Sequence, residues 1–187
     1  MNRIEAKFEQ LRAAGRSAFM PYICAGDPTE EISRKLLLTL EEAGADIIEL
    51  GVPFSDPIAD GPSIQKASER ALMDKISLRG VLDMVETLRQ ETQIPIALMT
   101  YYNPIFRLGE AEFCAAARKV GVDGVIIPDL PPEEASALLE VAPTHNLATI
   151  FLAAPTSPPE RMRFIASVST GFTVSYTHLT LPTKRIV

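Results

Sequence analysis

The sequence holds few of the residues that build metal centres and disulfide frameworks. It contains two cysteines, Cys24 and Cys114, and two histidines, His145 and His178. The cysteines lie far apart and in different predicted elements, so they form neither a disulfide framework nor a zinc motif. Two free thiols suit a reducing compartment. Because the histidines do not cluster, the sequence argues against a catalytic zinc, and no residue is assigned to a metal.

Basic clusters and long apolar runs are also scarce. The net charge is −6, and there is no Lys/Arg-rich run beyond short pairs such as Lys184 and Arg185 near the end. Nucleic acids and anionic membranes are therefore poor partners for this chain. The first residues alternate in charge and lack the apolar core of a signal peptide, and no stretch reaches roughly 18 apolar residues. We expect a cytoplasmic protein.

What is present is the alternation of short apolar segments with amphipathic ones. With 47% hydrophobic and 22% charged residues, a chain of 187 residues is globular and can bury a sizeable core as one domain. The spacing of apolar residues and the positions of Gly and Pro separate the two kinds of segment. Strands are predicted over residues 18–25, 47–50, 94–100, 122–128, 148–153 and 171–174, and helices over 8–14, 30–43, 64–73, 77–90, 111–120, from 131, and over 158–167.

This alternation predicts an α/β fold with a parallel sheet and helices outside it. Loops after strands are long (51–62, 102–109, 129–133) and loops before strands are short, as in the (β/α)8 TIM barrel, whose active sites lie at the carboxyl ends of the strands. Asp46 and Asp123 occupy the same position in a junction that occurs twice. In it, a helix end is followed by a Gly, a small or apolar residue, the Asp and then a buried strand. A doubly wound sheet is the alternative, but no predicted strand ends in a Gly-x-Gly-x-x-Gly turn.

Glu49 is the first candidate catalytic residue. It interrupts the apolar run formed by Ile47, Ile48 and Leu50, and a carboxylate on a buried strand is costly unless it is paired or used. A structural pair is the alternative to a working acid. Burial between apolar neighbours is expected to raise its pKa toward neutrality, which suits proton transfer.

Asp60 is the second candidate. The loop that separates it from Glu49 contains Pro53 and Pro57, and it can fold back over the strand end to hold Asp60 across a pocket from Glu49. Asp60 on a wetter loop is expected to stay anionic, so the two carboxylates would take different roles. Turn chemistry explains Asp60 equally well, and it is the preferred interpretation of Asp56, because Asp side chains bond the local backbone in turns.

Residues 49–62, ELGVPFSDPIADGP, closely resemble the signature segment of the tryptophan synthase alpha subunit family. Supporting matches are PYICAGDP at 21–28, MTYYNP at 99–104 and GVDGVIIPDLPPEE at 121–134. The resemblance runs from about residue 8 to residue 173. A match of this length that contains both acids at fixed spacing is specific, unlike an isolated glycine motif.

The resemblance implies a lyase of tryptophan biosynthesis, of the carbon-oxygen lyase class, that cleaves indole-3-glycerol phosphate to indole and glyceraldehyde 3-phosphate by a retro-aldol reaction. Glu49 would protonate the ring carbon that bears the side chain, and Asp60 would accept the indole N–H. The residues agree with this chemistry, because no lysine lies in predicted strands one to five and no cluster would hold a metal, which leaves carboxylates as the proton carriers. The resemblance implies no cofactor in this chain, since pyridoxal phosphate belongs to the beta subunit, its partner in an alpha2beta2 heterotetramer.

The remaining site residues predicted from the sequence are expected to bind substrate. Tyr101 and Asn103 are predicted to end strand three beside the pocket, although a tyrosine that bonds a loop and an Asn-Pro turn explain them as well. Asp129 ends strand four and could pair with a neighbouring loop. An apolar slot for the indole ring would be walled by Tyr22, Leu98, Ile127 and Leu152, for each of which an ordinary core position is the alternative.

The end of the sequence does not fit a complete barrel. A (β/α)8 chain needs roughly 250 residues, and the predicted strands number six. Residues 174–187 stop resembling the family, so we expect an incomplete barrel domain over residues 1–173 and an irregular tail over 174–187. The strands that would carry the family's phosphate site are then absent, so a non-catalytic fragment, or another phosphate-binding barrel enzyme, remains an alternative.

Overall fold

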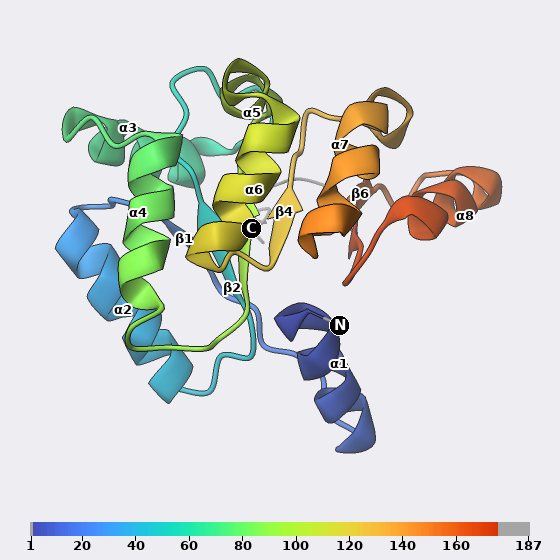
Figure 1. Ribbon diagram of the computed structural model, residues 1–187, viewed down its shortest axis with the longest axis horizontal. Helices are drawn as coiled ribbons and strands as arrows, with labels where there is room; N and C mark the ends of the chain where they lie inside the picture. The colour runs from blue at the N-terminus through green and yellow to red at the C-terminus, as the bar shows by residue number, and fades with distance from the viewer. Residues whose placement is uncertain (1, 176–187) are drawn as a thin grey trace, which may run out of the picture.

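Strands and helices alternate along residues 2–175, the part of the chain that the computed structural model describes (Figure 1). The strands are β1 (Tyr22–Cys24), β2 (Ile48–Gly51), β3 (Ile96–Met99), β4 (Gly124–Ile126), β5 (Ala148–Ile150), β6 (Leu152–Ala153) and β7 (Val174–Ser175). The helices are α1 (Arg3–Ala13), α2 (Glu30–Glu42), α3 (Pro62–Met73), α4 (Leu78–Leu88), α5 (Tyr102–Leu108), α6 (Glu110–Val120), α7 (Ser136–Val141) and α8 (Pro159–Val168), with 3-10 turns at Pro132–Glu134 and Ala142–His145.

The five central strands are parallel and follow one another in chain order, β1-β2-β3-β4-β5. A doubly wound sheet reverses its order at a switch point, so within the described residues the sequential order rules out that alternative. The order is that of a barrel wall, and it confirms the predicted α/β class. A separate parallel pair joins β6 to β7. Among residues 2–175 the sheet stays open at β1, which agrees with an incomplete barrel.

The two faces of the sheet pack against different things. One face meets the surrounding helices in the larger apolar cluster, to which Leu50, Leu98 and Val125 belong from successive strands. The other face carries a smaller cluster of Ile47, Ala97, Ile126, Ala148 and Ile150, joined by Ile4 from α1. Because successive side chains of a strand point to opposite faces, these two clusters define the outer and the inner face of the wall.

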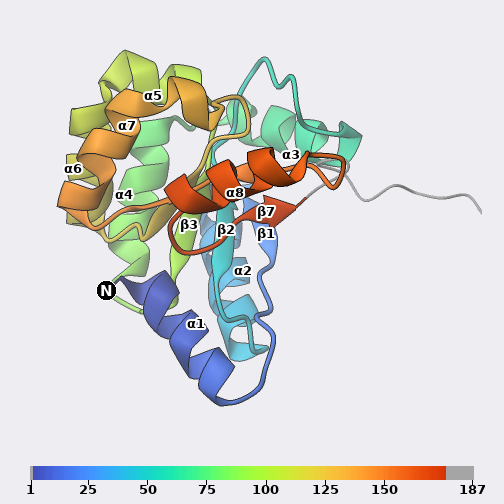
Figure 2. The same ribbon diagram turned by 90° about the vertical axis from the view of Figure 1, so that its right-hand side faces the viewer.

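Helix α1 closes the amino-terminal end of the inner face. Asn2 begins it with a capping box, in which its side chain accepts from the Glu5 N–H and the Glu5 carboxylate accepts from the Asn2 N–H, both at 3.0 Å. Ile4 then inserts against Gly124, where an added Cβ would lie 2.9 Å from Ile4 Cδ1. Figure 2 shows α1 beneath the strands and α3 and α5 at the opposite end, so the amino-terminal end of the inner face is covered by α1.

Four segments differ from the sequence prediction. The first helix begins at Arg3 rather than at residue 8, because Asn2 caps it. Residues 102–109, predicted as a loop, contain α5, because Pro104 lies in the first helical turn, where proline is tolerated. The predicted strand at 148–153 divides into β5 and β6 at Phe151. After Pro131 a 3-10 turn precedes α7, so the α-helix begins only at Ser136.

The predicted tail lies almost entirely outside the described residues. Val174 and Ser175 form β7 against β6, with Val174 opposite Leu152 and Ser175 opposite Ala153. Residues 176–187 are not part of the described structure. The division of the chain at residue 173 into a barrel domain and a tail therefore stays a prediction.

The turn between α3 and α4 makes one stability prediction. Lys75 adopts φ 55° there, a left-handed conformation that costs a residue with a Cβ on the order of 1 kcal/mol. Replacing Lys75 with Gly is expected to raise the free energy of unfolding by roughly 0.5 kcal/mol, because the relief exceeds the added entropy of the unfolded chain. Urea unfolding measures the change. Lys75→Ala is the control, since it removes the charge but keeps the Cβ, and an equal gain from both variants would contradict the backbone argument.

Candidate active site

Glu49 lies on the inner face of the wall near the carboxyl end of β2. The register places it opposite Tyr22 on β1 and Ala97 on β3. Burial raises the pKa of Glu49 above its ordinary value, and no neighbouring charge opposes the shift. The direction is the one predicted from its apolar neighbours. A carboxyl group in this position holds its proton to a higher pH than an exposed glutamate does.

Asp60 lies in the loop between β2 and α3, directly before Gly61 and Pro62, which begin the helix. The carboxyl group is less exposed to water than the sequence suggests, and the anionic state expected of Asp60 stays a prediction. Burial raises the pKa of Asp60, and the hydroxyl of Tyr101 offsets part of that shift. Its Oδ1 atom is buried and has no hydrogen-bond partner within residues 2–175.

The loop over the strand end is held in place by Tyr101. The Ala59 N–H donates to the Tyr101 hydroxyl at 3.0 Å, and the Phe54 ring stacks on the Tyr101 ring at 4.9 Å between centroids. Gln65 Nε2 also donates to the Asp60 carbonyl at 2.8 Å. These contacts explain why Asp60 is more buried than its turn-rich sequence suggests, because they draw the loop back onto the end of the sheet.

The sequence predicted that Tyr101 and Asn103 end strand three, and this was wrong, because β3 ends at Met99. Tyr101 is the residue that caps α5, it is buried, and its hydroxyl reaches the Asp60 loop. Asn103 lies inside α5 with an exposed side chain. Asp129, after β4, accepts the Tyr102 N–H through Oδ1 at 2.9 Å. The predicted pairing of Asp129 with a neighbouring loop segment therefore occurs, and it anchors the start of α5.

The predicted walls of the slot divide between the two faces of the sheet. Tyr22 lies opposite Glu49, and Leu152 packs with the inner cluster, so both are on the expected side. Leu98 and Ile127 are buried in the outer cluster among the helices, so their placement on the Glu49 face was wrong. A shift of one residue moves a strand side chain to the other face. Met99, which pairs with Gly51 and packs with the inner cluster, lies where Leu98 was expected.

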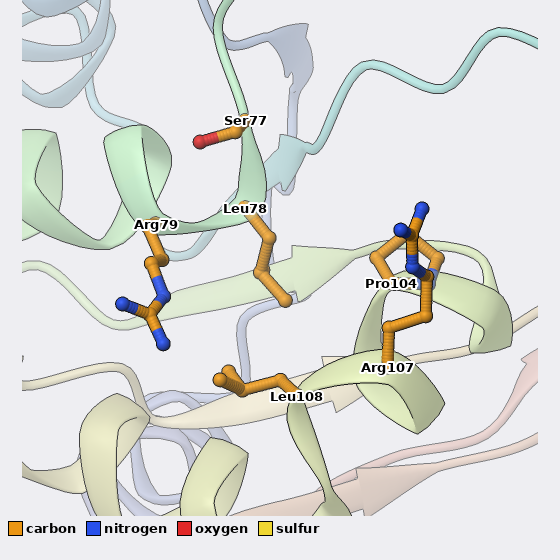
Figure 3. A pocket seen from close by; sticks show the side chains of 6 residues that line it. All are labelled: Ser77, Leu78, Arg79, Pro104, Arg107 and Leu108. Atoms are coloured by element: carbon orange, nitrogen blue, oxygen red, sulfur yellow. The ribbon is translucent and has the colours of Figure 1, made fainter.

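A cavity lies outside the barrel wall, between the start of α4 and α5. Figure 3 shows Arg79 and Arg107 on opposite sides of an apolar floor that includes Leu78 and Leu108, and the cavity measures about 360 Å³. It contains no carboxylate among its lining residues, which are Ser77, Leu78, Arg79, Pro104, Arg107 and Leu108. This cavity therefore offers no group for the acid chemistry predicted from the sequence.

Residues 2–175 hold neither a metal-binding cluster nor a membrane-spanning helix. Across residues 2–175, no three His, Cys, Asp or Glu side chains group closely enough to hold a metal ion. None of the helices in that part of the chain combines the length and the apolar character needed to cross a bilayer. The two free cysteines are both buried.

Comparison with known proteins bears on the resemblance found in the sequence. The family model described as tryptophan synthase alpha chain matches residues 8–181. The chain belongs to this family. A tryptophan synthase alpha chain of Prochlorococcus marinus (strain CCMP1986 / NIES-2087 / MED4) is 47% identical over 182 residues, which cover 96% of this chain and 65% of the relative. The family resemblance and the barrel fold predicted from the sequence are thus confirmed.

Solved structures agree. The tryptophan synthase alpha subunit of Legionella pneumophila str. Paris superimposes with a TM-score of 0.92 at 44% identity, covering 97% of this chain and 69% of that one. A chain from the tryptophan synthase α2β2 complex of Pyrococcus furiosus gives a TM-score of 0.81 at 45% identity, covering 84% and 65%. The chain spans 65% of the length of the Prochlorococcus relative. The strands β1 to β5 and the loop that carries Asp60 therefore belong to a barrel that is longer in its relatives.

Proposed function

We propose that this chain carries the acid-base centre of a lyase that cleaves indole-3-glycerol phosphate to indole and glyceraldehyde 3-phosphate in tryptophan biosynthesis. The family of the chain supports the reaction class. The observation that carries the assignment of the site is the unpartnered, buried Oδ1 of Asp60, in the loop that follows the strand of the half-buried Glu49. A buried acceptor without a donor is costly, and an indole N–H is a donor of the right kind.

Glu49 would act as the proton carrier. Because burial raises its pKa, Glu49 is protonated over a wider pH range than an exposed glutamate and can deliver a proton to the indole ring carbon that bears the side chain. The protonated ring becomes the electron sink for breaking the carbon-carbon bond. Glu49, then ionised, can take the proton of the glycerol hydroxyl whose carbon becomes the aldehyde. Each cleavage thus returns Glu49 to its starting state.

Asp60 would stabilise the charge that forms on the ring nitrogen. Its buried Oδ1 accepts the indole N–H, and the bond strengthens as the ring becomes cationic. The Tyr101 hydroxyl favours the ionised carboxylate, which this role requires. Neither step uses a cofactor of this chain.

The first alternative is another phosphate-binding barrel enzyme. Such an enzyme would share the scaffold, yet it has no need of one buried acid on β2 and a second on the following loop. The other alternative is a fragment that binds a partner without catalysis. Both differ from the proposal in one measurable respect, because neither predicts that Asp60 binds indole.

The test uses the absence of tryptophan from the sequence. Indole fluorescence excited near its red edge carries no tryptophan background, so indole binding to the 187-residue chain can be titrated directly. We expect Asp60→Asn to weaken binding by about tenfold, because the amide keeps the shape and loses the charge that strengthens the bond. Glu69→Gln on the exposed face of α3 is the control. Equal affinities for the wild type and Asp60→Asn would refute the role of Asp60.

We further propose that a tryptophan synthase beta subunit docks over the carboxyl end of the strands, in an α2β2 assembly. Two large apolar side chains are exposed at that end, Ile58 in the Asp60 loop at 82% and Phe106 in α5 at 65%. Apolar side chains exposed beside a reaction centre mark an interaction surface. Pyridoxal phosphate would be bound by that partner, which consumes the indole.

The loop over residues 53–57 would couple the partner to the acids. Phe54 in this loop stacks on the Tyr101 ring, and Ala59 just after the loop donates its N–H to the Tyr101 hydroxyl. That hydroxyl in turn lowers the pKa of Asp60. We expect saturating beta subunit to raise the rate of indole formation by a chain of the relatives' length, and Asp56→Ala to reduce that increase. Among the described residues the Asp56 carboxylate accepts only the Ser55 hydroxyl, so Asp56→Ala removes no hydrogen bond to the backbone of the loop. Identical rates with and without the partner would contradict the coupling.

A further inference from the structure

Helix α3 lies at the carboxyl end of the strands (Figure 2) and follows Asp60 directly, but it is attached to the barrel wall by its second half. Gly61 caps its amino end without a side-chain hydrogen bond. Within residues 2–175, the side-chain bonds that join α3 to β1 and the loop after it come from Ser68 and Arg70. Ser68 Oγ and Cys24 Sγ lie 3.9 Å apart, and both residues are buried.

Arg70, in the last turn of α3, forms a two-pronged ion pair with Asp27 in the loop after β1. Its Nε and Nη2 atoms donate to the two carboxylate oxygens of Asp27, each at 2.7 Å. The Asp27 side chain is 18% exposed and the Arg70 side chain 50%. Exposed ion pairs usually contribute little, but a bidentate pair fixes direction as well as distance. This pair therefore sets how the second half of α3 lies on the wall.

The loop that carries Asp27 gives the ion pair a firm support. The Gly26 N–H donates to Ser33 Oγ at 2.9 Å, and Ser33 is buried on α2. Gly26 also lies close to α3, because an added Cβ would lie 3.4 Å from Ala71 Cβ. The loop is thus fixed to α2 on one side and packed against α3 on the other.

We propose that Asp27 and Arg70 are positioning residues for Asp60, and that their ion pair, the Asp27–Arg70 clamp, sets the place of Asp60 by holding α3 on the loop after β1. A helix transmits such a constraint because it is rigid, and the axial distance from Pro62 to Arg70 is only about 12 Å. At the amino end, Gln65 Nε2 donates to the Asp60 carbonyl at 2.8 Å and ties the acid to the helix. The importance of the clamp for catalysis rests on the proposed function, in which Asp60 accepts the indole N–H.

The clamp is tested without substrate, by amide hydrogen exchange in the 187-residue chain. The reporter is the Ala59 N–H beside Asp60, which donates to the Tyr101 hydroxyl at 3.0 Å. Asp27→Asn keeps the shape but leaves one acceptor oxygen instead of two, and we expect it to speed exchange at Ala59 by about three- to tenfold. The Ala148 N–H, bonded at 2.9 Å to the segment before β4, is the internal reference and should stay within about twofold. A general loss of stability would instead speed exchange at Ala148. Unchanged exchange at Ala59, or equal acceleration at both amides, overturns the proposal.

Two further variants show whether the ion pair itself is responsible. Glu91→Gln is the matched control, since it also replaces a carboxylate with an amide but pairs with Arg34 on α2, at 3.0 Å. We expect it to change neither rate, and an acceleration at Ala59 equal to that in Asp27→Asn would contradict the clamp. Arg70→Gln should speed exchange at Ala59 as Asp27→Asn does, and the double variant should be no faster than either. Additive effects would show that Asp27 and Arg70 act separately and would overturn the clamp.

Indole affinity separates the clamp from the proposed function. We expect Asp27→Asn to weaken indole binding by about threefold, less than Asp60→Asn, because the carboxylate of Asp60 is displaced but not removed. Faster exchange at Ala59 together with no indole binding by the wild type would support the clamp and refute the proposed function. Unchanged exchange at Ala59 together with indole binding that depends on Asp60 would refute the clamp and leave the proposed function standing.

Discussion

Glu49→Gln is expected to reduce indole formation from indole-3-glycerol phosphate by about 10²- to 10⁴-fold, in a chain of the relatives' length with its partner. The amide keeps the size of the side chain on β2 but cannot deliver a proton. Indole affinity should stay within about twofold of the wild type, because Asp60 supplies that bond. Steady-state indole release measures the loss, and Glu86→Gln on the exposed face of α4 is the control. Comparable turnover in Glu49→Gln and the wild type would exclude Glu49 as the acid.

The same substitution makes a prediction of opposite sign for stability. The pKa of Glu49 is raised in the folded chain, so between the unfolded and the folded pKa the native state binds the extra proton. Stability is therefore lost as pH rises through that window. Glu49→Gln removes the cost of ionising a buried carboxyl, and its free energy of unfolding should exceed that of the wild type at pH 7 but match it at low pH. A gain in stability in Glu49→Gln is what the role proposed for Glu49 predicts, because functional groups are often held at a cost to stability.

Some residues of the candidate site can be predicted from the sequence and others cannot, for a physical reason. Glu49 is recognisable because a carboxylate inside an apolar strand has no explanation in local structure. The burial of Asp60 is not recognisable, since it depends on Tyr101, which is distant in sequence and reaches the loop only after α5 forms. Helix α5 was missed because Asn103 and Pro104 look like a turn, while proline in a first helical turn costs nothing.

The sequence also does not predict to which face of the sheet each strand residue points. Strands buried on both sides are apolar throughout, so β3 offers no polar alternation from which to choose between Leu98 and Met99. Among the five central strands of residues 2–175, β2 alone carries a charged residue, Glu49, and the hydrogen-bond register relates its face to those of the neighbouring strands. The fold class survives such errors, because it depends on the order of elements rather than on the phase of any one strand.

The repeated helix-Gly-Asp-strand junction predicts the largest loss of stability. Asp123 is 4% exposed and accepts from Arg89 Nη2, Arg3 Nη1 and the Ile96 N–H, each at 2.9 Å. The Arg89 side chain is 9% exposed, and burial lowers its pKa while Asp123 opposes that shift. This carboxylate therefore compensates a buried cation under the sheet, at the end opposite the acids.

Asp123→Ala is expected to lower the free energy of unfolding by about 3–5 kcal/mol, because it leaves Arg89 buried without its counter-charge. Asp46 is the matched control from the same position of the other junction. It accepts the Phe19 N–H at 3.0 Å, but its cations are distant and more exposed, Lys7 at 3.9 Å and Arg16 at 3.7 Å. Asp46→Ala should therefore cost about 1–2 kcal/mol. Urea unfolding of both variants decides the matter, and a loss in Asp46→Ala equal to that in Asp123→Ala would show that the strand-start hydrogen bond, rather than the buried Arg89, sets the cost.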